Sequence, residues 1–259
     1  MAKEEQRLRS SIVARTLAAQ GHVELILESR ELSRAVPGQF AHVLTPGMLR
    51  RPLSFSRIDP EHNRVGLLFQ VVGSGTAWLA ERQTNDVLDV LGPLGHGFPA
   101  PDPVRPWVLV GGGVGVPPLF AATQMWLQHT ISTPQVIIGA RTGAWVVMEN
   151  DFKRLGVPLT VTTDDGSQGQ PGNVLAPLQT WLDAHREGQV YACGPVPMLQ
   201  AIRRLALGRA TAYLALEQRM GCGIGACLAC VVPTVGNSGM SYRRVCTDGP
   251  VFKAEELMW

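Results

Sequence analysis

Four cysteines near the C-terminal end of the chain have the spacing of a metal-ligand set. Cys222, Cys227 and Cys230 form a C-x4-C-x2-C run, and Cys246 follows after fifteen more residues. Plant-type [2Fe–2S] clusters take their thiolates from this spacing, two for each iron. The residues between the ligands are mostly Gly and Ala, so backbone N–H groups can approach the sulfur atoms. The spacing predicts a one-electron redox centre.

Two other uses of these cysteines fit the sequence less well. A structural zinc site usually takes its thiolates as two C-x2-C pairs, and here only Cys227 and Cys230 form such a pair. Disulfide frameworks are typical of short secreted chains, whereas this chain has 259 residues and 5 cysteines, an odd number. Zinc stays open as the alternative metal.

The composition is that of a packed globular chain with nearly balanced charge. Apolar residues make up 45% of the chain, and the formal net charge is +2, which gives no case for a nucleic-acid or membrane-surface partner. The charged N-terminus lacks the apolar region of a secretion signal. Residues 106–140 contain no Asp, Glu, Lys or Arg, but Gly and Pro interrupt them, which favours buried α/β structure over a membrane span. Five thiols, most of them in a metal motif, favour a cytoplasmic location.

The first region, residues 8–100, is expected to form a barrel. Short strand patterns separated by turns occur at 23–27, 40–44 and 65–72, and this spacing predicts a small antiparallel β-barrel. The segment 98–106 then contains four prolines, which cannot donate to a sheet ladder. We therefore place the first domain boundary there.

The second region, residues 101–212, alternates strand and helix patterns, which predicts a doubly wound parallel α/β sheet. The strand patterns lie at 107–110, 135–138, 159–162 and 189–192, and the helical ones near 117–129, 149–155, 173–185 and 195–207. Residues 213–259 carry the four spaced cysteines and little regular pattern. The expected fold class is therefore α+β multidomain, with a barrel, a nucleotide-binding domain and a cluster region.

Two motifs in the barrel region have the chemistry to bind a nucleotide cofactor. The run 51–54 reads Arg-Pro-Leu-Ser, in which Arg51 can hold a pyrophosphate and Ser54 offers a hydroxyl. The turn 73–76 reads Gly-Ser-Gly-Thr, between a strand and a helical pattern, where free N–H groups favour phosphate. Each motif alone fits an ordinary role equally well, as an edge strand or as a turn with Thr76 as N-cap.

A glycine-rich turn follows the first strand of the α/β region, at Gly111–Gly115. Such a turn allows close backbone approach to a dinucleotide, although Val116 replaces the last Gly of the common fingerprint and Arg141 stands near the expected acidic position. Asp164 and Cys193 follow later strands, at the sheet edge where α/β folds bind ligands. A packing turn, and Cys193 as a small buried apolar residue, remain the alternatives.

The order of these motifs resembles the ferredoxin-reductase-like flavoproteins, in which a flavin barrel precedes a pyridine-nucleotide domain. The resemblance narrows to the electron transfer subunits of the NAD-linked, two-component dihydroorotate dehydrogenases of pyrimidine biosynthesis. The segments that carry it are 92–98, 163–167, 191–195, 217–227 and 244–252.

The resemblance implies a role for each motif. Cys222, Cys227, Cys230 and Cys246 would ligate the [2Fe–2S] cluster. FAD would lie against Arg51, Pro52, Leu53, Ser54, Leu68, Phe69, Gln70, Gly75 and Thr76. NAD(H), as an exchangeable substrate, would contact Gly111, Gly112, Gly113, Gly115, Asp164, Cys193 and Gly194.

The resemblance also implies a partner, because this chain is expected to hold no catalytic base for dihydroorotate. An FMN-containing catalytic subunit would supply that chemistry, in a heterotetramer with two copies of each chain. Val231–Val235 and the tail 257–259 are candidates for the docking surface, with core packing as the other interpretation. Two alternatives stay open: a similar subunit serving sulfide, ferredoxin or hydrogenase chemistry, and a redox-sensing module. The choice between NAD and NADP also stays open.

Overall fold

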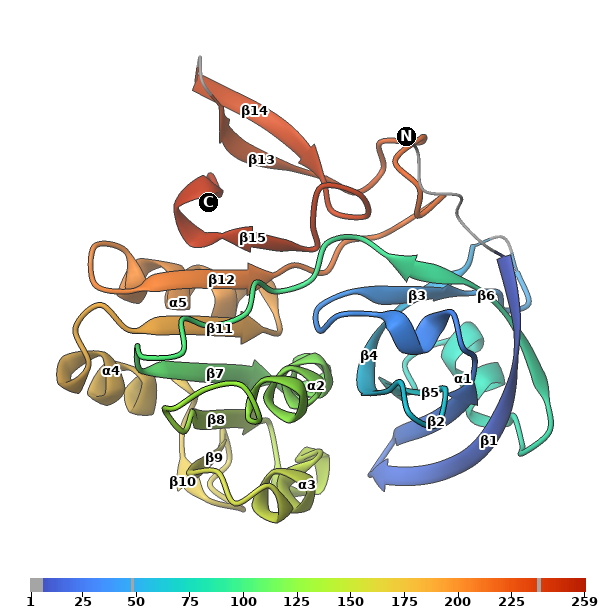
Figure 1. The fold of residues 1–259 in the computed structure, drawn as a ribbon, viewed down its shortest axis with the longest axis horizontal. Helices are drawn as coiled ribbons and strands as arrows, with labels where there is room; N and C mark the ends of the chain where they lie inside the picture. The colour runs from blue at the N-terminus through green and yellow to red at the C-terminus, as the bar shows by residue number, and fades with distance from the viewer. Residues whose placement is uncertain (1–6, 48, 237–238) are drawn as a thin grey trace.

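The computed structural model describes residues 7–47, 49–236 and 239–259, which form a barrel beside a mixed sheet, with a hairpin next to the last strand of that sheet (Figure 1). The predicted fold class is therefore confirmed. The charged N-terminal segment up to residue 6 lies outside the described residues.

The N-terminal part is a closed antiparallel barrel with the strand order β1-β2-β5-β4-β3-β6. Alternate side chains fill its interior, among them Leu25, Val43 and Phe55, because successive residues of a strand point to opposite faces. The elements are β1 (Arg7–Ala19), β2 (His22–Glu28), η1 (Leu32–Arg34), β3 (Phe40–Val43), β4 (Arg51–Asp59), β5 (Arg64–Gln70), α1 (Ser74–Ala80) and β6 (Val87–Leu94).

The second part is a sheet of seven strands in the order β10-β9-β8-β7-β11-β12-β15. All four predicted strands are present and parallel to their neighbours. These strands are β7 (Trp107–Gly112), β8 (Gln135–Ala140), β9 (Leu159–Thr163) and β11 (Gln189–Cys193). After β7 the chain forms β8 and β9 on one side of that strand and then forms β11 on its other side. The strand order therefore reverses between β7 and β11, and their carboxyl ends are the switch point of the sheet.

Helices cover both faces of this sheet, as the alternation along β7 requires. Val108 and Val110 face a core shared with α4 and α5, whereas Trp107 and Leu109 face a core shared with α2 and α3. The predicted helical segments correspond to α2 (Val116–Trp126), α3 (Glu149–Arg154), α4 (Leu175–Ala184) and α5 (Val196–Ala206). Short elements between them are η2 (Gly113–Gly115), η3 (Gly143–Trp145) and β10 (Gln170–Pro171).

The C-terminal region is more regular than its sequence indicated. The remaining elements are β12 (Thr211–Ala215), β13 (Val231–Gly236), β14 (Gly239–Arg244), β15 (Val251–Lys253) and η4 (Ala254–Glu256). The boundary that we predicted at 212/213 falls inside β12, and β15 pairs antiparallel with β12 as the last strand of the sheet. These strands are short, and half their residues are polar or glycine, so a hydrophobic pattern gives little signal for them.

The proline-rich segment between barrel and sheet is packed rather than loose. It contains no helix or strand, as predicted, but Phe98 is buried and meets the rings of Trp126 and Tyr191 edge-on. Within the described residues, no helix has the length and apolar character needed to cross a membrane.

A polar network fixes the barrel against the nucleotide sheet. Arg57 on β4 donates from Nε to Glu24 at 2.9 Å and from Nη2 to Asp151 on α3 at 2.8 Å. The Ser56 hydroxyl also donates to Glu24, at 2.7 Å, and the guanidinium lies over the ring of Phe120. Because Glu24 is buried, its carboxylate needs these donors. The Arg57 side chain thereby joins two strands of the barrel to α3 beside the sheet.

We predict that Arg57→Ala lowers the free energy of unfolding by about 2 kcal/mol, because it leaves the buried Glu24 carboxylate with one donor fewer. Urea denaturation of the purified chain measures the change. The control is Arg154→Ala, which removes an exposed partner of the same Asp151 and should cost no more than about 0.5 kcal/mol. Equal effects of the two substitutions would contradict a special role for Arg57.

Candidate cofactor sites

The four spaced cysteines lie together in two pairs. The amide N–H of Cys222 points to the sulfur of Cys227 at 3.5 Å, and the amide of Cys227 points to the sulfur of Cys222 at 3.4 Å. In the second pair, the amide of Cys246 points to the sulfur of Cys230 at 3.4 Å. Two cysteines per metal is the ligand arrangement of a two-iron cluster.

The pairing differs from a mononuclear site. A tetrahedral zinc site requires four donors around one point, whereas a [2Fe–2S] core spreads its four thiolates over two iron atoms. The donor set and its arrangement therefore fit the cluster.

The two pairs differ in exposure, and the pKa of one cysteine in each pair is shifted. Burial would raise the pKa of Cys222, but the amides of Ile224 and Cys227 outweigh it and lower that pKa to about 7. Burial, together with Cys230, raises the pKa of Cys246 to about 12. Metal binding requires thiolates, so Cys222 can ligate near neutral pH, whereas Cys246 loses its proton only when a metal binds.

The cluster loop is held by an ion pair and by unusual backbone geometry. Arg244 binds Asp248 through Nη2 at 3.0 Å and donates to the carbonyl oxygen of Gly225 at 3.4 Å. Leu228 has a φ of 56°, a left-handed conformation that is uncommon for a leucine, and its side chain is 59% exposed. The backbone is therefore wrapped tightly around the cysteines, with an apolar side chain projecting outward.

The barrel motifs that we assigned to FAD meet in space. A Cβ atom on Gly75 would lie 2.5 Å from Nε of Arg51, so the guanidinium is packed directly against the backbone of Gly75. Arg51 donates from Nη1 to the carbonyl oxygen of Leu49 at 2.9 Å, which leaves other N–H donors of the side chain available for an anion. The β4 run and the turn before α1 thus form one polar corner.

Other residues of the FAD prediction are placed differently. Thr76 is the third residue of α1 rather than its N-cap, which is Gly73. Its hydroxyl accepts hydrogen bonds from the amides of Val72 and Gly73 and donates to the Gly73 carbonyl oxygen, so it closes the turn. Phe69 packs inside the barrel, and Leu68 packs against the nucleotide sheet. Pro52, Leu53, Ser54 and Gln70 are partly exposed on β4 and β5.

The glycine turn and the fifth cysteine meet at the switch point of the sheet. Cys193, the last residue of β11, pairs in register with Gly111 of β7, and Gly194 follows it. Desolvation of the thiol, with a smaller effect of Glu217, raises the pKa of Cys193 to about 12, so the thiol is neutral. Asp164 lies two strands away, after β9, where its amide donates to the carbonyl oxygen of Ala140 at 3.1 Å.

Three residues near these sites were missed by the sequence analysis. Glu217 lies close enough to Cys193 to affect its pKa. The buried His42 and the half-buried Thr247 have buried polar side-chain atoms with no hydrogen-bond partner within the described part of the chain, and they lie against Gly223 and Gly225 of the cluster loop, respectively. Glu217 and Thr247 lie in the segments 217–227 and 244–252 that carry the family resemblance, whereas His42 is remote from every motif.

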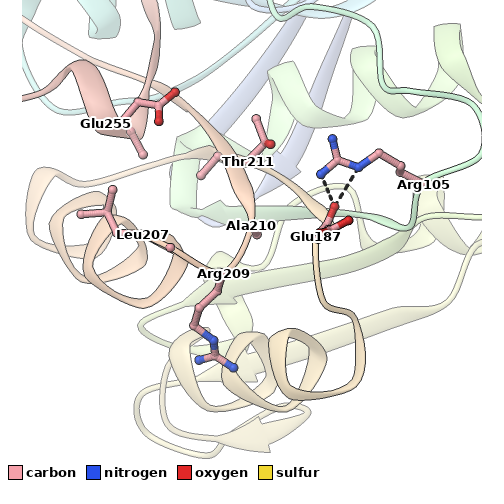
Figure 2. A pocket seen from close by; sticks show the side chains of 10 residues that line it. Arg105, Glu187, Leu207, Arg209, Ala210, Thr211 and Glu255 are labelled. Carbon is pink, nitrogen blue, oxygen red and sulfur yellow. Dashed lines mark hydrogen bonds between the residues drawn. The ribbon is translucent and has the colours of Figure 1, made fainter.

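A cavity of about 490 Å³ lies at the other end of the sheet (Figure 2). Its wall includes Arg105, which donates to the backbone carbonyl of Glu187, and Thr211, the first residue of β12. These residues precede β7, β11 and β12, whereas nucleotides bind at the carboxyl ends of parallel strands. The cavity is therefore separate from the cofactor positions.

Comparison with known proteins agrees with this architecture. Residues 217–258 match the family described as the iron-sulfur cluster binding domain of dihydroorotate dehydrogenase B, and residues 109–204 match the oxidoreductase NAD-binding domain. One solved structure, titled as an NADH-dependent reduced ferredoxin-NADP oxidoreductase, is 28% identical with a TM-score of 0.84, covering 100% of this chain and 92% of that one. Phthalate dioxygenase reductase shares the fold at 15% identity, with a TM-score of 0.68 and coverage of 93% and 77%. The barrel, sheet and iron–sulfur region together define a member of the ferredoxin-reductase-like superfamily.

Two curated relatives belong to one family within this superfamily. The protein of Geobacillus kaustophilus named dihydroorotate dehydrogenase B (NAD(+)), electron transfer subunit, is 41% identical over 97% of this chain and 98% of its own length. The protein of the same name from Shouchella clausii is 40% identical over 100% of both chains. This chain belongs to the family of dihydroorotate dehydrogenase B electron transfer subunits.

We predict that Cys→Ser substitution at 222, 227, 230 or 246 leaves the chain with less iron than the wild type, because a serine hydroxyl does not replace a thiolate on iron. Iron, zinc and acid-labile sulfide per chain are measured after anaerobic purification. Cys193→Ser is the matched control and should keep the full iron content, because its sulfur lies on β11. Zinc in place of iron, or iron loss in the control, would contradict the assignment.

Proposed function

We propose that this chain passes electrons between a nicotinamide nucleotide, FAD and a [2Fe–2S] cluster, and exchanges them with a catalytic partner subunit that oxidises dihydroorotate to orotate. The observation that carries the proposal is the gathering of the four cysteines into two pairs beside the barrel, in a chain related over its full length to electron transfer subunits. When bound, FAD exchanges two electrons with the nicotinamide as a hydride and one at a time with the cluster.

The residues of the barrel have the task of binding and orienting FAD. Arg51 offers its remaining N–H donors to the pyrophosphate, beside the backbone of Gly75 and Thr76. The flavin ring lies against the surface of β4 formed by Pro52, Leu53 and Ser54. The end of β5 contacts the flavin through the backbone of Leu68, Phe69 and Gln70 and through the Gln70 side chain. The buried side chains of Leu68 and Phe69 keep this strand end rigid.

The residues at the switch point have the task of admitting NAD(H). The turn of Gly111, Gly112, Gly113 and Gly115 lies directly against the backbone of Cys193 and Gly194, and NAD(H) would approach this end of the sheet. The neutral Cys193 thiol places no charge beside a nicotinamide ring, which suits a position where hydride must move. Asp164 borders the same edge of the sheet from β9.

We assign the dihydroorotate chemistry to an FMN-containing partner in a cytoplasmic heterotetramer with two copies of each chain, so that this chain oxidises no dihydroorotate by itself. The side chains around the outer cysteine pair suit such docking. Ile224 and Leu228 are exposed apolar residues next to Cys222 and Cys227. Of the docking candidates from the sequence, Val235 is exposed, whereas Val232 and Leu257 are core residues.

The decisive assay combines the chain with its natural partner. Anaerobic addition of NADH should bleach the flavin band and then the cluster band of the isolated chain, and orotate should form from dihydroorotate and NAD+ only when both subunits are present. A second candidate is ferredoxin-linked chemistry, because the NADH-dependent ferredoxin oxidoreductase aligns along this whole chain. Reduction of ferredoxin without orotate formation would favour that candidate. A flavin band that NADH does not bleach would favour a redox sensor.

We predict that Leu228→Asn weakens partner binding at least about tenfold, about 1.4 kcal/mol, because it removes an exposed apolar side chain next to the outer cysteines. Asparagine tolerates the left-handed backbone of this position, so the iron content should not change. Titration of partner binding measures the effect. Ile131→Asn, an equally polar change on an exposed residue away from the cysteines, is the control. Equal affinities of both variants would remove Leu228 from the docking surface.

A further inference from the structure

His42 lies between the strand that carries the FAD motif and the loop that carries the outer cysteines. On β3, Ala41 and Val43 point into the barrel, while Phe40 packs against the core shared with the cluster region. His42 lies on the same outer face as Phe40, because side chains alternate along a strand. It pairs in register with Pro52 of β4, the second residue of the Arg-Pro-Leu-Ser run.

The ring of His42 is packed directly against the cluster loop. A Cβ atom on Gly223 would lie 2.5 Å from His42 Nδ1, and Gly223 has a φ of 76°, so glycine is needed here for both space and conformation. The backbones of Cys222 and Arg50 also face the ring. The imidazole therefore contacts the residue that follows a proposed iron ligand.

Burial of the His42 ring without hydrogen bonds lowers the stability of the folded protein. His42 is fully buried, and among the residues that the structure describes neither Nδ1 nor Nε2 finds a hydrogen-bond partner. Each such unpaired polar atom costs on the order of 1–3 kcal/mol, and unpaired buried groups are rare in folded proteins. A leucine of similar volume would avoid this cost, so a role in stability alone does not account for the histidine.

We propose that His42 is a positioning residue for electron transfer, whose buried ring, with Nδ1 packed against Gly223, fixes the cluster loop against the flavin-bearing strand. The inference rests on the proposed function. The step that it assists moves one electron from the reduced flavin to the oxidised cluster, and the imidazole itself gains or loses neither electron nor proton. Backbone placement matters because the electron passes between two groups held at a fixed separation, and a displaced loop changes that separation and orientation.

The test compares three substitutions in the chain loaded with FAD and iron. His42→Leu should slow reduction of the cluster by NADH-reduced flavin about tenfold, followed by stopped-flow absorbance, and should change the electron paramagnetic resonance spectrum of the reduced cluster. His42→Asn places an amide near the Nδ1 position and should restore most of the rate, whereas His42→Gln, which reaches the Nε2 position, should not. His185→Leu, at the C-cap residue of α4, where the ring Nδ1 is hydrogen-bonded to the carbonyl oxygen of Trp181, is the control.

Each outcome decides the inference separately from the proposed function. Absence of iron or FAD in the wild-type chain would overturn the proposed function itself. If the wild type holds both cofactors and His42→Leu keeps the wild-type rate and spectrum, only the role of His42 is overturned. If the leucine variant does not retain iron, the Asn and Gln variants decide: equal rates in these two would show that ring volume alone matters.

Discussion

The outer face of β3 and β4 is the surface on which the arrangement of this protein depends. The barrel fills its interior with one set of alternating side chains, and the other set is therefore free to make contacts outside it. On β3 these outer residues are Phe40 and His42, which meet the core of the sheet and the cluster loop. On β4 the network of Arg57 joins the barrel to α3. The outer face of β3 and β4 thus contacts both the nucleotide sheet and the cluster loop and positions each of them against the barrel.

The sequence predicted those features that depend on local spacing. The four cysteines, the parallel strands and the glycine turn are each encoded within a few residues, and the structure brings Arg51 to Gly75 and Cys193 to Gly111 as the motifs indicated. The sequence could not predict the contacts of His42, because they come from the cluster loop, more than a hundred residues away. It could not predict the contact of Glu217 either, because this comes from Cys193 on another strand. Their residue types carry no pattern until the fold places them.

The C-terminal strands show a second limit of sequence patterns. β15 contains three residues, and its pairing with β12 depends on an edge that the nucleotide sheet already offers. Such a strand is stabilised by its neighbour rather than by its own propensity, so a window of sequence does not reveal it. The alternative interpretation of Thr76 as an N-cap is wrong for a related reason: its hydroxyl closes the turn from the third helical position, and only the backbone shows which residue comes first.

The pairing of β15 with β12 also limits how electrons can leave the molecule. Leu214 pairs with Phe252, and the amide of Leu216 donates to the carbonyl oxygen of Pro250, so the chain returns to the sheet a few residues after Cys246. Both ends of the cysteine region are thereby anchored by backbone hydrogen bonds to the same sheet. The redox centre cannot swing between donor and acceptor as a tethered carrier domain does. The acceptor protein must come to it, and the rate of delivery becomes a matter of docking rather than of internal motion.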